Sequence, residues 1–210
     1  MRFVKFIGEF LKHPKQVGAV AESSPFLARK MARQINGAIN IVEFGPGTGP
    51  VTREILRHLP ENGRLTCFEI NPGFCEQLKT IKDRRLRVIN DDVQNYDKYV
   101  DNFDCILPSL PLGNFNKSEI EQVFALSSKS KIYIQFQYTP FLIPKLKRYF
   151  RDVKIKFVPL NFPPAFVYIS RSPRNKPCCA EGYSSRKVRR MVFAKKVMQI
   201  LLVFANFWNR

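Results

Sequence analysis

Ile41-Val42-Glu43-Phe44-Gly45-Pro46-Gly47-Thr48-Gly49 carries the strongest local signal in this chain of 210 residues. An apolar strand runs directly into a glycine-rich turn, and a helical pattern follows at Val51–His58. Glycines in such a turn let the backbone approach a ligand closely, and the start of the helix offers free N–H donors. The spacing is GxGxG rather than the GxGxxG of dinucleotide binders, and no Lys-Ser/Thr pair follows as in a phosphate loop. A tight turn without a ligand is the alternative interpretation.

Acidic residues follow the next two predicted strands. Glu69 lies 24 residues after Gly45, within Cys67-Phe68-Glu69-Ile70-Asn71, and Asp91-Asp92 follows the third strand. The carboxyl ends of parallel strands meet at one edge of a sheet, where ligands bind in this architecture. An acid after the second strand can accept hydrogen bonds from both ribose hydroxyls, and an acid after the third can accept one from an adenine amino group. The pattern therefore predicts a nucleoside site.

Strand-like and helix-like segments alternate through the middle of the chain. The predicted strands are Ile39–Phe44, Arg64–Glu69, Leu86–Asn90, Phe103–Pro108, Lys131–Gln137, Val153–Val158 and Ala165–Ser170. The predicted helices of this region are Val51–His58, Gly73–Lys82, Lys117–Leu126 and Phe141–Phe150. This alternation predicts an α/β fold with a seven-stranded, mostly parallel, doubly wound sheet, whose last two strands are close enough to form a hairpin.

Positive charge gathers at the two ends of the sequence. The net charge is +18, of which residues 1–40 carry +5, residues 41–170 carry +4 and residues 171–210 carry +9. Basic surfaces attract polyanions, which are either nucleic acid or an anionic lipid surface. A role in solubility alone is the third interpretation.

Three domains or segments follow from composition. Residues 1–36 contain two predicted helices, Arg2–Lys12 and Pro25–Ile35, the first of them basic and amphipathic. Residues 37–170 hold the predicted sheet, and residues 171–210 form a basic linker followed by a helix over Ser185–Trp208. The sequence of each flanking helix is compatible with binding at a membrane surface and with packing of its apolar side against the core of the domain.

Several classes of protein are not expected from this sequence. No apolar run reaches the roughly 18 residues of a transmembrane helix, and charges interrupt the N-terminal apolar residues, so neither a membrane span nor export is predicted. Five Cys without paired CxxC spacing and only two His predict a reduced, cytoplasmic protein without a metal site.

The glycine turn and its acids resemble those of the class I S-adenosylmethionine-dependent methyltransferases. Glu43–Gly49 is similar to their first motif, Glu69 to the ribose-binding acid, and Asp92 with Val93 to the adenine-contacting pair. The resemblance covers about residues 35–170 and implies a Rossmann-like sheet of order 3-2-1-4-5-7-6, with S-adenosyl-L-methionine as cofactor. The cofactor-binding residues that it implies are Glu43, Gly45, Gly47, Gly49, Glu69, Asn71, Asp92, Val93 and Ser109.

Four further segments resemble the bacterial phospholipid N-methyltransferases, which convert phosphatidylethanolamine stepwise to phosphatidylcholine. These segments are Gly18–Ser24, Ser109–Leu112, Gln135–Tyr138 and Asn161–Tyr168. The resemblance implies a peripheral enzyme on the inner face of the membrane, with an anionic lipid surface as partner and a phospholipid as substrate. Tyr138, Ser109 and Asn161 are the candidates for orienting the amine that accepts the methyl group.

Other functions stay open at this point. A relative group methylates ornithine lipids, and an rRNA adenine N6-methyltransferase would share the cofactor turn and fit the basic charge. In adenine methyltransferases an aromatic residue commonly follows the proline of the fourth strand's motif and stacks the base, whereas Leu112 stands there in this chain. Nucleic acid is therefore not the expected partner. A membrane-surface module without activity is the non-enzymatic alternative, and the head group, the number of methyl groups and the oligomeric state stay open.

Overall fold

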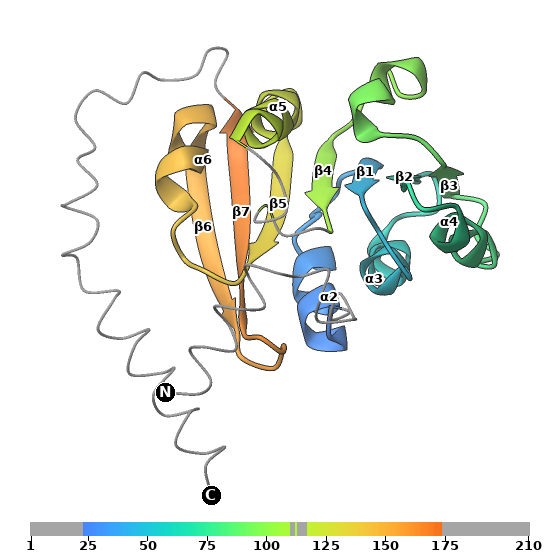
Figure 1. Cartoon of the computed structure of the whole chain (residues 1–210), viewed down its shortest axis with the longest axis horizontal. Helices are drawn as coiled ribbons and strands as arrows, with labels where there is room; N and C mark the ends of the chain where they lie inside the picture. Colours follow the sequence, from blue (N-terminus) through green and yellow to red (C-terminus); the bar gives the residue numbers. More distant parts are fainter. Residues whose placement is uncertain (1–22, 110–111, 113–116, 174–210) are drawn as a thin grey trace, which may run out of the picture. The chain divides into compact units, whose positions relative to one another are not determined.

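The computed structural model describes residues 23–109, 112 and 117–173 (Figure 1). The predicted helix Arg2–Lys12 and the predicted helix Ser185–Trp208 lie outside the described residues. No helix in the described part of the chain is long and apolar enough to cross a bilayer.

One seven-stranded sheet forms the centre of the fold, in the order β3-β2-β1-β4-β5-β7-β6. Strands β1 to β5 pair in parallel, and β7 pairs antiparallel with both β5 and β6. The strands are β1 (Asn40–Phe44), β2 (Arg64–Phe68), β3 (Leu86–Ile89), β4 (Cys105–Pro108), β5 (Ile132–Gln137), β6 (Phe150–Val158) and β7 (Ala165–Pro173). The predicted fold class, the strand order and the hairpin of the last two strands are thus confirmed.

Five α-helices accompany the sheet in the described residues, and four of them begin at a proline or have one in the first turn. Proline is favoured there because its missing N–H has no helical partner at that position. The helices are α2 (Pro25–Ala32), α3 (Pro50–His58), α4 (Pro72–Lys79), α5 (Lys117–Ser127) and α6 (Ile143–Tyr149). The Ser24 hydroxyl caps α2 by accepting a hydrogen bond from Leu27 N at 3.2 Å.

The two faces of the sheet have separate apolar cores, because successive strand residues point to opposite faces. On one face Ile134 belongs to the cluster that includes Leu27 of α2 and Ile55 of α3. On the other face Tyr133 contacts Phe124 of α5, with ring centroids 6.1 Å apart. The chain is therefore doubly wound.

The structure differs from the predicted elements mainly at β6 and β7. Strand β6 begins at Phe150, where a helix was predicted to end, and β7 continues to Pro173, into the predicted linker. The two extensions pair with each other, Phe150 opposite Pro173. The adjacent charged residues Arg151 and Asp152 interrupt the apolar alternation before Val153, so the sequence pattern placed the start of this edge strand three residues too late. A 3₁₀ helix at Val93–Lys98 (η1), which buries no residue, was not predicted.

Candidate functional site

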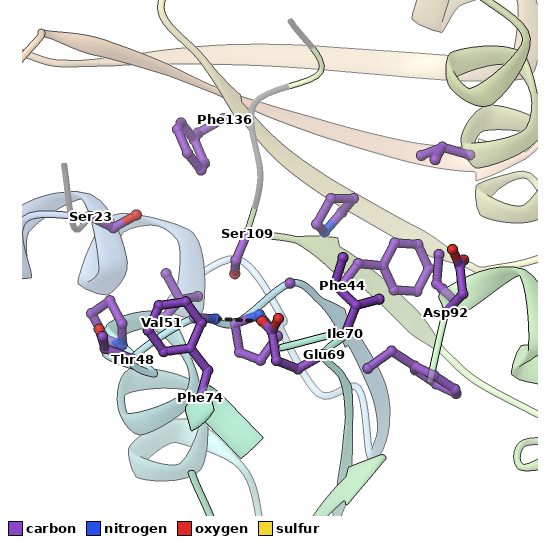
Figure 2. Close-up of a pocket in the computed structure, with 18 of the residues that line it drawn as sticks. Ser23, Phe44, Thr48, Val51, Glu69, Ile70, Phe74, Asp92, Ser109 and Phe136 are labelled. Carbon is purple, nitrogen blue, oxygen red and sulfur yellow. Dashed lines mark hydrogen bonds between the residues drawn. The ribbon is translucent and has the colours of Figure 1, made fainter. Parts of the chain in front are cut away.

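A cavity of about 290 Å³ opens at the carboxyl edge of the sheet (Figure 2). Its walls come from the glycine turn after β1, from the ends of β2, β3 and β4, and from Ser23 before α2. Val123 of α5 and Phe136 of β5 complete the wall. The cavity therefore lies where the parallel strands end, as predicted for the nucleoside site.

The glycine turn needs its glycines for two different reasons. Gly45, Gly47 and Gly49 have φ angles of +58°, +58° and +84°, which L-residues with a side chain rarely adopt. A Cβ on Gly47 would meet no heavy atom within 4 Å, because its Cα borders the cavity. A Cβ on Gly49 would lie 2.7 Å from Leu78 Cδ2. Gly45 and Gly47 line the cavity, whereas Gly49 precedes α3 and packs close to α4.

Glu69 holds the turn from the end of β2. Its carboxylate accepts hydrogen bonds from the backbone N–H of Gly47 at 3.1 Å and from that of Asn71 at 2.9 Å, one on each oxygen. Each oxygen has further acceptor capacity, and Glu69 lines the cavity. Asn71 does not belong to the lining; its side chain caps α4 by accepting from Gly73 N at 2.8 Å.

The acids after β3 differ in their surroundings. Asp91 accepts hydrogen bonds from Asn95 Nδ2 and the Tyr99 hydroxyl, both at 2.9 Å, and these lower its pKa. Asp92 caps η1 by accepting from Gln94 N at 2.8 Å, and its side chain is exposed. Asp91, Asp92 and the neighbouring Val93 all line the cavity.

Glu43 lies fully buried beneath the cavity and is connected to it by one side chain. The Ser109 hydroxyl, which lines the cavity, donates to Glu43 Oε1 at 2.5 Å. Thr52 Oγ1 and Cys67 Sγ donate to Glu43 Oε2 at 2.7 and 3.4 Å. Burial raises the pKa of Glu43 to about 6, and the three hydrogen bonds oppose this rise. No motif in the sequence marked Thr52 or Cys67 as partners of Glu43, because only the fold brings them together.

Two predicted catalytic residues are not among the residues that line the cavity. The Tyr138 ring packs against that of Phe136, with centroids 5.7 Å apart, and burial raises the pKa of Tyr138 to about 12. Asn161 joins the β6–β7 loop to α2: its Oδ1 accepts from Ser24 N at 2.9 Å, and its Nδ2 donates to the Pro163 carbonyl at 2.7 Å. The roles of Tyr138 and Asn161 in orienting an amine stay predictions.

The apolar side chains that line the cavity, among them Ile70, Phe74 and Phe136, were not predicted from the sequence. Figure 2 shows Ser109 between Glu69 and Phe136, and Phe74 and Ile70 near the glycine turn. Phe136 precedes the end of β5 and occupies an ordinary core position of the strand pattern. Phe136 lies within Gln135–Tyr138, a segment of the family resemblance, but the strand pattern alone gave no sign that its side chain lines a cavity.

Comparisons with known proteins agree with this geometry. Residues 41–129 match the family model described as a methyltransferase domain. An ornithine lipid N-methyltransferase from Singulisphaera acidiphila is 29% identical over 183 residues, which cover 80% of this chain and 95% of that protein.

Two solved structures share the fold at low sequence identity. A precorrin-6y C5,15-methyltransferase from Geobacter metallireducens is 14% identical with a TM-score of 0.54, and the match covers 70% of this chain and 86% of that one. The N-terminal domain of EvdMO1, solved in the presence of SAH and D-fucose, is 13% identical with a TM-score of 0.55, over 74% of this chain and 85% of that one.

The residues at the cavity fit the cofactor that such domains use. The bare Cα of Gly47 leaves room for a ligand, and the adjacent Glu69 carboxylate has acceptor capacity for hydroxyl groups. The described domain has the Rossmann-like fold of methyltransferases, and the fold together with the family match indicates S-adenosyl-L-methionine as its cofactor.

Proposed function

We propose that this protein transfers a methyl group from S-adenosyl-L-methionine to the head-group amine of a membrane lipid, with phosphatidylethanolamine as the first candidate. The observation that carries the proposal is the wall of the cavity around Ser109. The lining of the cavity combines this hydroxyl with the apolar side chains of Leu112, Val123 and Phe136. A hydroxyl beside apolar side chains suits a small amine on an aliphatic chain better than a polar base.

The cofactor roles follow from the hydrogen bonds at the glycine turn. Gly47 N and Asn71 N each donate to one oxygen of the Glu69 carboxylate, and each oxygen can accept a second hydrogen bond. Glu69 accepts these further hydrogen bonds from the ribose hydroxyls. Gly45 and Gly47 bring the backbone close to the cofactor, and Asp92 with Val93 contacts its adenine.

Three further predicted residues act through their neighbours. Gly49 shapes the start of α3, and Asn71 fixes Glu69 through its backbone N–H and caps α4. Glu43 fixes Ser109.

The chemistry demands an unprotonated amine in line with the methyl group, at about 3 Å. The cofactor supplies that methyl group on a positively charged sulfur, already activated for transfer. The hydroxyl proton of Ser109 is directed to Glu43, so the Ser109 oxygen offers its lone pairs to the cavity and can accept an N–H of the amine. This contact orients the nitrogen lone pair, and the reaction releases the remaining amine proton to water.

A flipped adenine fits this wall less well. Leu112, which is 4% exposed, lines the cavity and has no π-face on which a base can stack. This argues against the RNA adenine methyltransferase alternative.

Ornithine lipid is the second candidate acceptor, favoured by a specific observation. The relative from Singulisphaera acidiphila is named for this substrate, and the match spans 95% of that protein. Both head groups carry a primary amine on a short alkyl chain near an anionic group. The Ser109 hydroxyl can bind the amine of either lipid. The choice between the two lipids depends on whether the protein recognises the phosphate of phosphatidylethanolamine or the carboxylate of ornithine lipid.

The proposed location is the inner face of the membrane, where the protein binds peripherally from the cytoplasm. Residues 1–40 and 171–210 hold 14 of the 18 excess positive charges. Each Lys or Arg near an anionic leaflet contributes about 1 kcal/mol to binding.

Thin-layer separation of lipids tests the proposal. The purified full chain is incubated with methyl-labelled S-adenosyl-L-methionine and vesicles that contain phosphatidylethanolamine, ornithine lipid and an anionic lipid. We expect label in one of the two amine lipids, and the migration of the product identifies which. If both lipids stay unlabelled while a lipid-free structured RNA gains label, the proposal is wrong.

A further inference from the structure

Large apolar side chains that are exposed gather at one edge of the sheet. Among the described residues there are seven of them: Phe26, Ile39, Ile70, Phe74, Phe141, Leu160 and Phe162. Only Ile39, before β1, belongs to the amino edge. Ile70 and Phe74 line the cavity, so they already have a place in the proposed site. Phe26, Phe141, Leu160 and Phe162 have no such place, and we call these four residues the apolar edge surface.

The register of the strands places the loops of this surface at the same end of the sheet. Gln137 at the end of β5 pairs with Phe166 at the start of β7. The β5–α6 loop, which holds Phe141, therefore emerges beside the β6–β7 loop, which holds Leu160 and Phe162 (Figure 1).

The start of α2 is attached to the β6–β7 loop. Ser24 N donates to Asn161 Oδ1 at 2.9 Å, and the Ser24 hydroxyl donates to the Leu160 carbonyl at 2.7 Å. Phe26, in the first turn of α2, thereby joins the surface.

The β5–α6 loop is held in place while its phenylalanine stays in solvent. The buried Tyr168 donates its hydroxyl proton to the Thr139 carbonyl at 2.7 Å, and Leu142 N donates to the same hydroxyl oxygen at 3.4 Å. Phe141 lies between these two anchored positions and is 72% exposed. Hydrogen bonds on both sides of Phe141 therefore hold the loop in a conformation that exposes this side chain.

The charge of the same segments matches an anionic partner. Residues 23–33, 138–148 and 159–164 contain six Lys or Arg and no Asp or Glu. Five of the six cationic side chains are exposed, although Arg29 also lies 3.9 Å from Glu54. Exposed apolar side chains on segments that also carry exposed cations are a composition that binds at the interface of an anionic bilayer.

We infer that the apolar edge surface inserts into the interfacial region of an anionic lipid bilayer. This inference deepens the proposed function and rests on it for the identity of the partner. Ser23 and Phe136 line the cavity and lie three residues before Phe26 and five before Phe141. Insertion of the surface therefore brings the mouth of the cavity to the head groups.

Vesicle flotation of the full chain tests the surface without any turnover. The vesicles contain equal parts of phosphatidylethanolamine and phosphatidylglycerol, and the variant combines Phe141→Ser, Leu160→Ser and Phe162→Ser. We expect the partition coefficient to fall about tenfold for each side chain that no longer reaches lipid. The matched control is Ile39→Ser at the amino edge, which should leave partition unchanged. Equal flotation of the triple variant and the wild type would overturn the inference.

Fluorescence gives a second, independent measurement, which detects insertion directly and does not require a variant that binds less. Phe162→Trp is introduced with Trp208→Phe, which removes the single native tryptophan. With vesicles that carry brominated acyl chains, we expect a blue shift and quenching of the new tryptophan. Emission that vesicles leave unchanged contradicts insertion. If the triple variant instead changes the sedimentation of the protein and floats normally, the surface binds a second copy of the chain and the inference is wrong.

The surface and the proposed function can fail separately. Methylation is measured in parallel on a short-chain phosphatidylethanolamine and a short-chain ornithine lipid, each below its micelle concentration, so that no bilayer is needed. Methylation of either dispersed lipid with normal flotation of the triple variant overturns the surface and leaves the function standing. Weaker flotation of the variant, with no lipid methylated in either form, supports the surface and removes the function.

Discussion

Glu43 provides a prediction whose size follows from its burial. Its carboxylate is completely buried beneath the cavity, and burial raises its pKa from 4.5 to about 6. The folded state therefore binds the Glu43 proton more tightly than the unfolded state does. The stability that this group contributes is fully present below pH 4.5 and is lost as the pH rises through about 6. A pKa difference of about 1.5 corresponds to about 2 kcal/mol.

Glu43→Gln removes this titration and keeps an acceptor for Ser109. The new amide group faces the hydroxyl of Thr52 and the thiol of Cys67. The changed hydrogen bonds shift the free energy of unfolding of the variant by an amount that does not depend on pH. We therefore expect the free energy of unfolding of the variant, relative to wild type, to rise by about 2 kcal/mol between pH 4.5 and pH 7. At pH 7 the variant gains stability from the absence of a buried charge while it weakens the support of Ser109.

Urea unfolding followed by circular dichroism, at a series of pH values, measures this difference. Glu76→Gln is the matched control, because the Glu76 side chain is 73% exposed and pairs with Lys79 on the surface of α4. A rise in this control as large as that of Glu43→Gln would attribute the effect to the loss of one acidic residue rather than to burial. A flat profile for Glu43→Gln would refute the reasoning, since it would mean that Glu43 has the same proton affinity in the folded and unfolded chain.

Three further outcomes test the site. Glu69→Gln should weaken binding of S-adenosylhomocysteine about 100-fold by calorimetry, because it loses charge-assisted hydrogen bonds worth about 3 kcal/mol, whereas Glu76→Gln should bind normally. Ser109→Ala should lower kcat about tenfold or more and change cofactor affinity little, since the hydroxyl contacts the amine. Equal losses in kcat and in cofactor affinity would contradict the role of Ser109 in orienting the amine. Gly49→Ala should lower stability by about 2 kcal/mol through its positive φ and its close leucine neighbour, while Gly47→Ala should cost less stability and more cofactor affinity.

Local pattern in the sequence determined the secondary structure and the position of the cofactor turn. The glycines after β1 and the prolines at helix starts have conformational preferences of their own, which act before any tertiary contact forms. The buried strands of the parallel part were predicted within two residues at either end. Edge strand β6 was predicted three residues short at its start, because the charged pair Arg151-Asp152 interrupts the apolar alternation there.

The acid after β2 could also be predicted, since strand ends in a parallel sheet meet at one edge. The strand order itself came from resemblance to a family, because nothing in the alternation of strands and helices says which strands are neighbours. The structure then confirmed that order.

Only the tertiary structure decided which side chains share the site. Glu43 and Ser109 are 66 residues apart and meet because β1 and β4 are neighbours in the sheet. Tyr138 and Asn161 also lie near strand ends at this edge; the Tyr138 ring packs against Phe136, Asn161 joins a loop to α2, and neither is among the residues that line the cavity. A sequence pattern gives the face of a strand on which a residue lies. The direction of a side chain beyond the strand end depends on the loop and on its neighbours, which are set by contacts between distant segments.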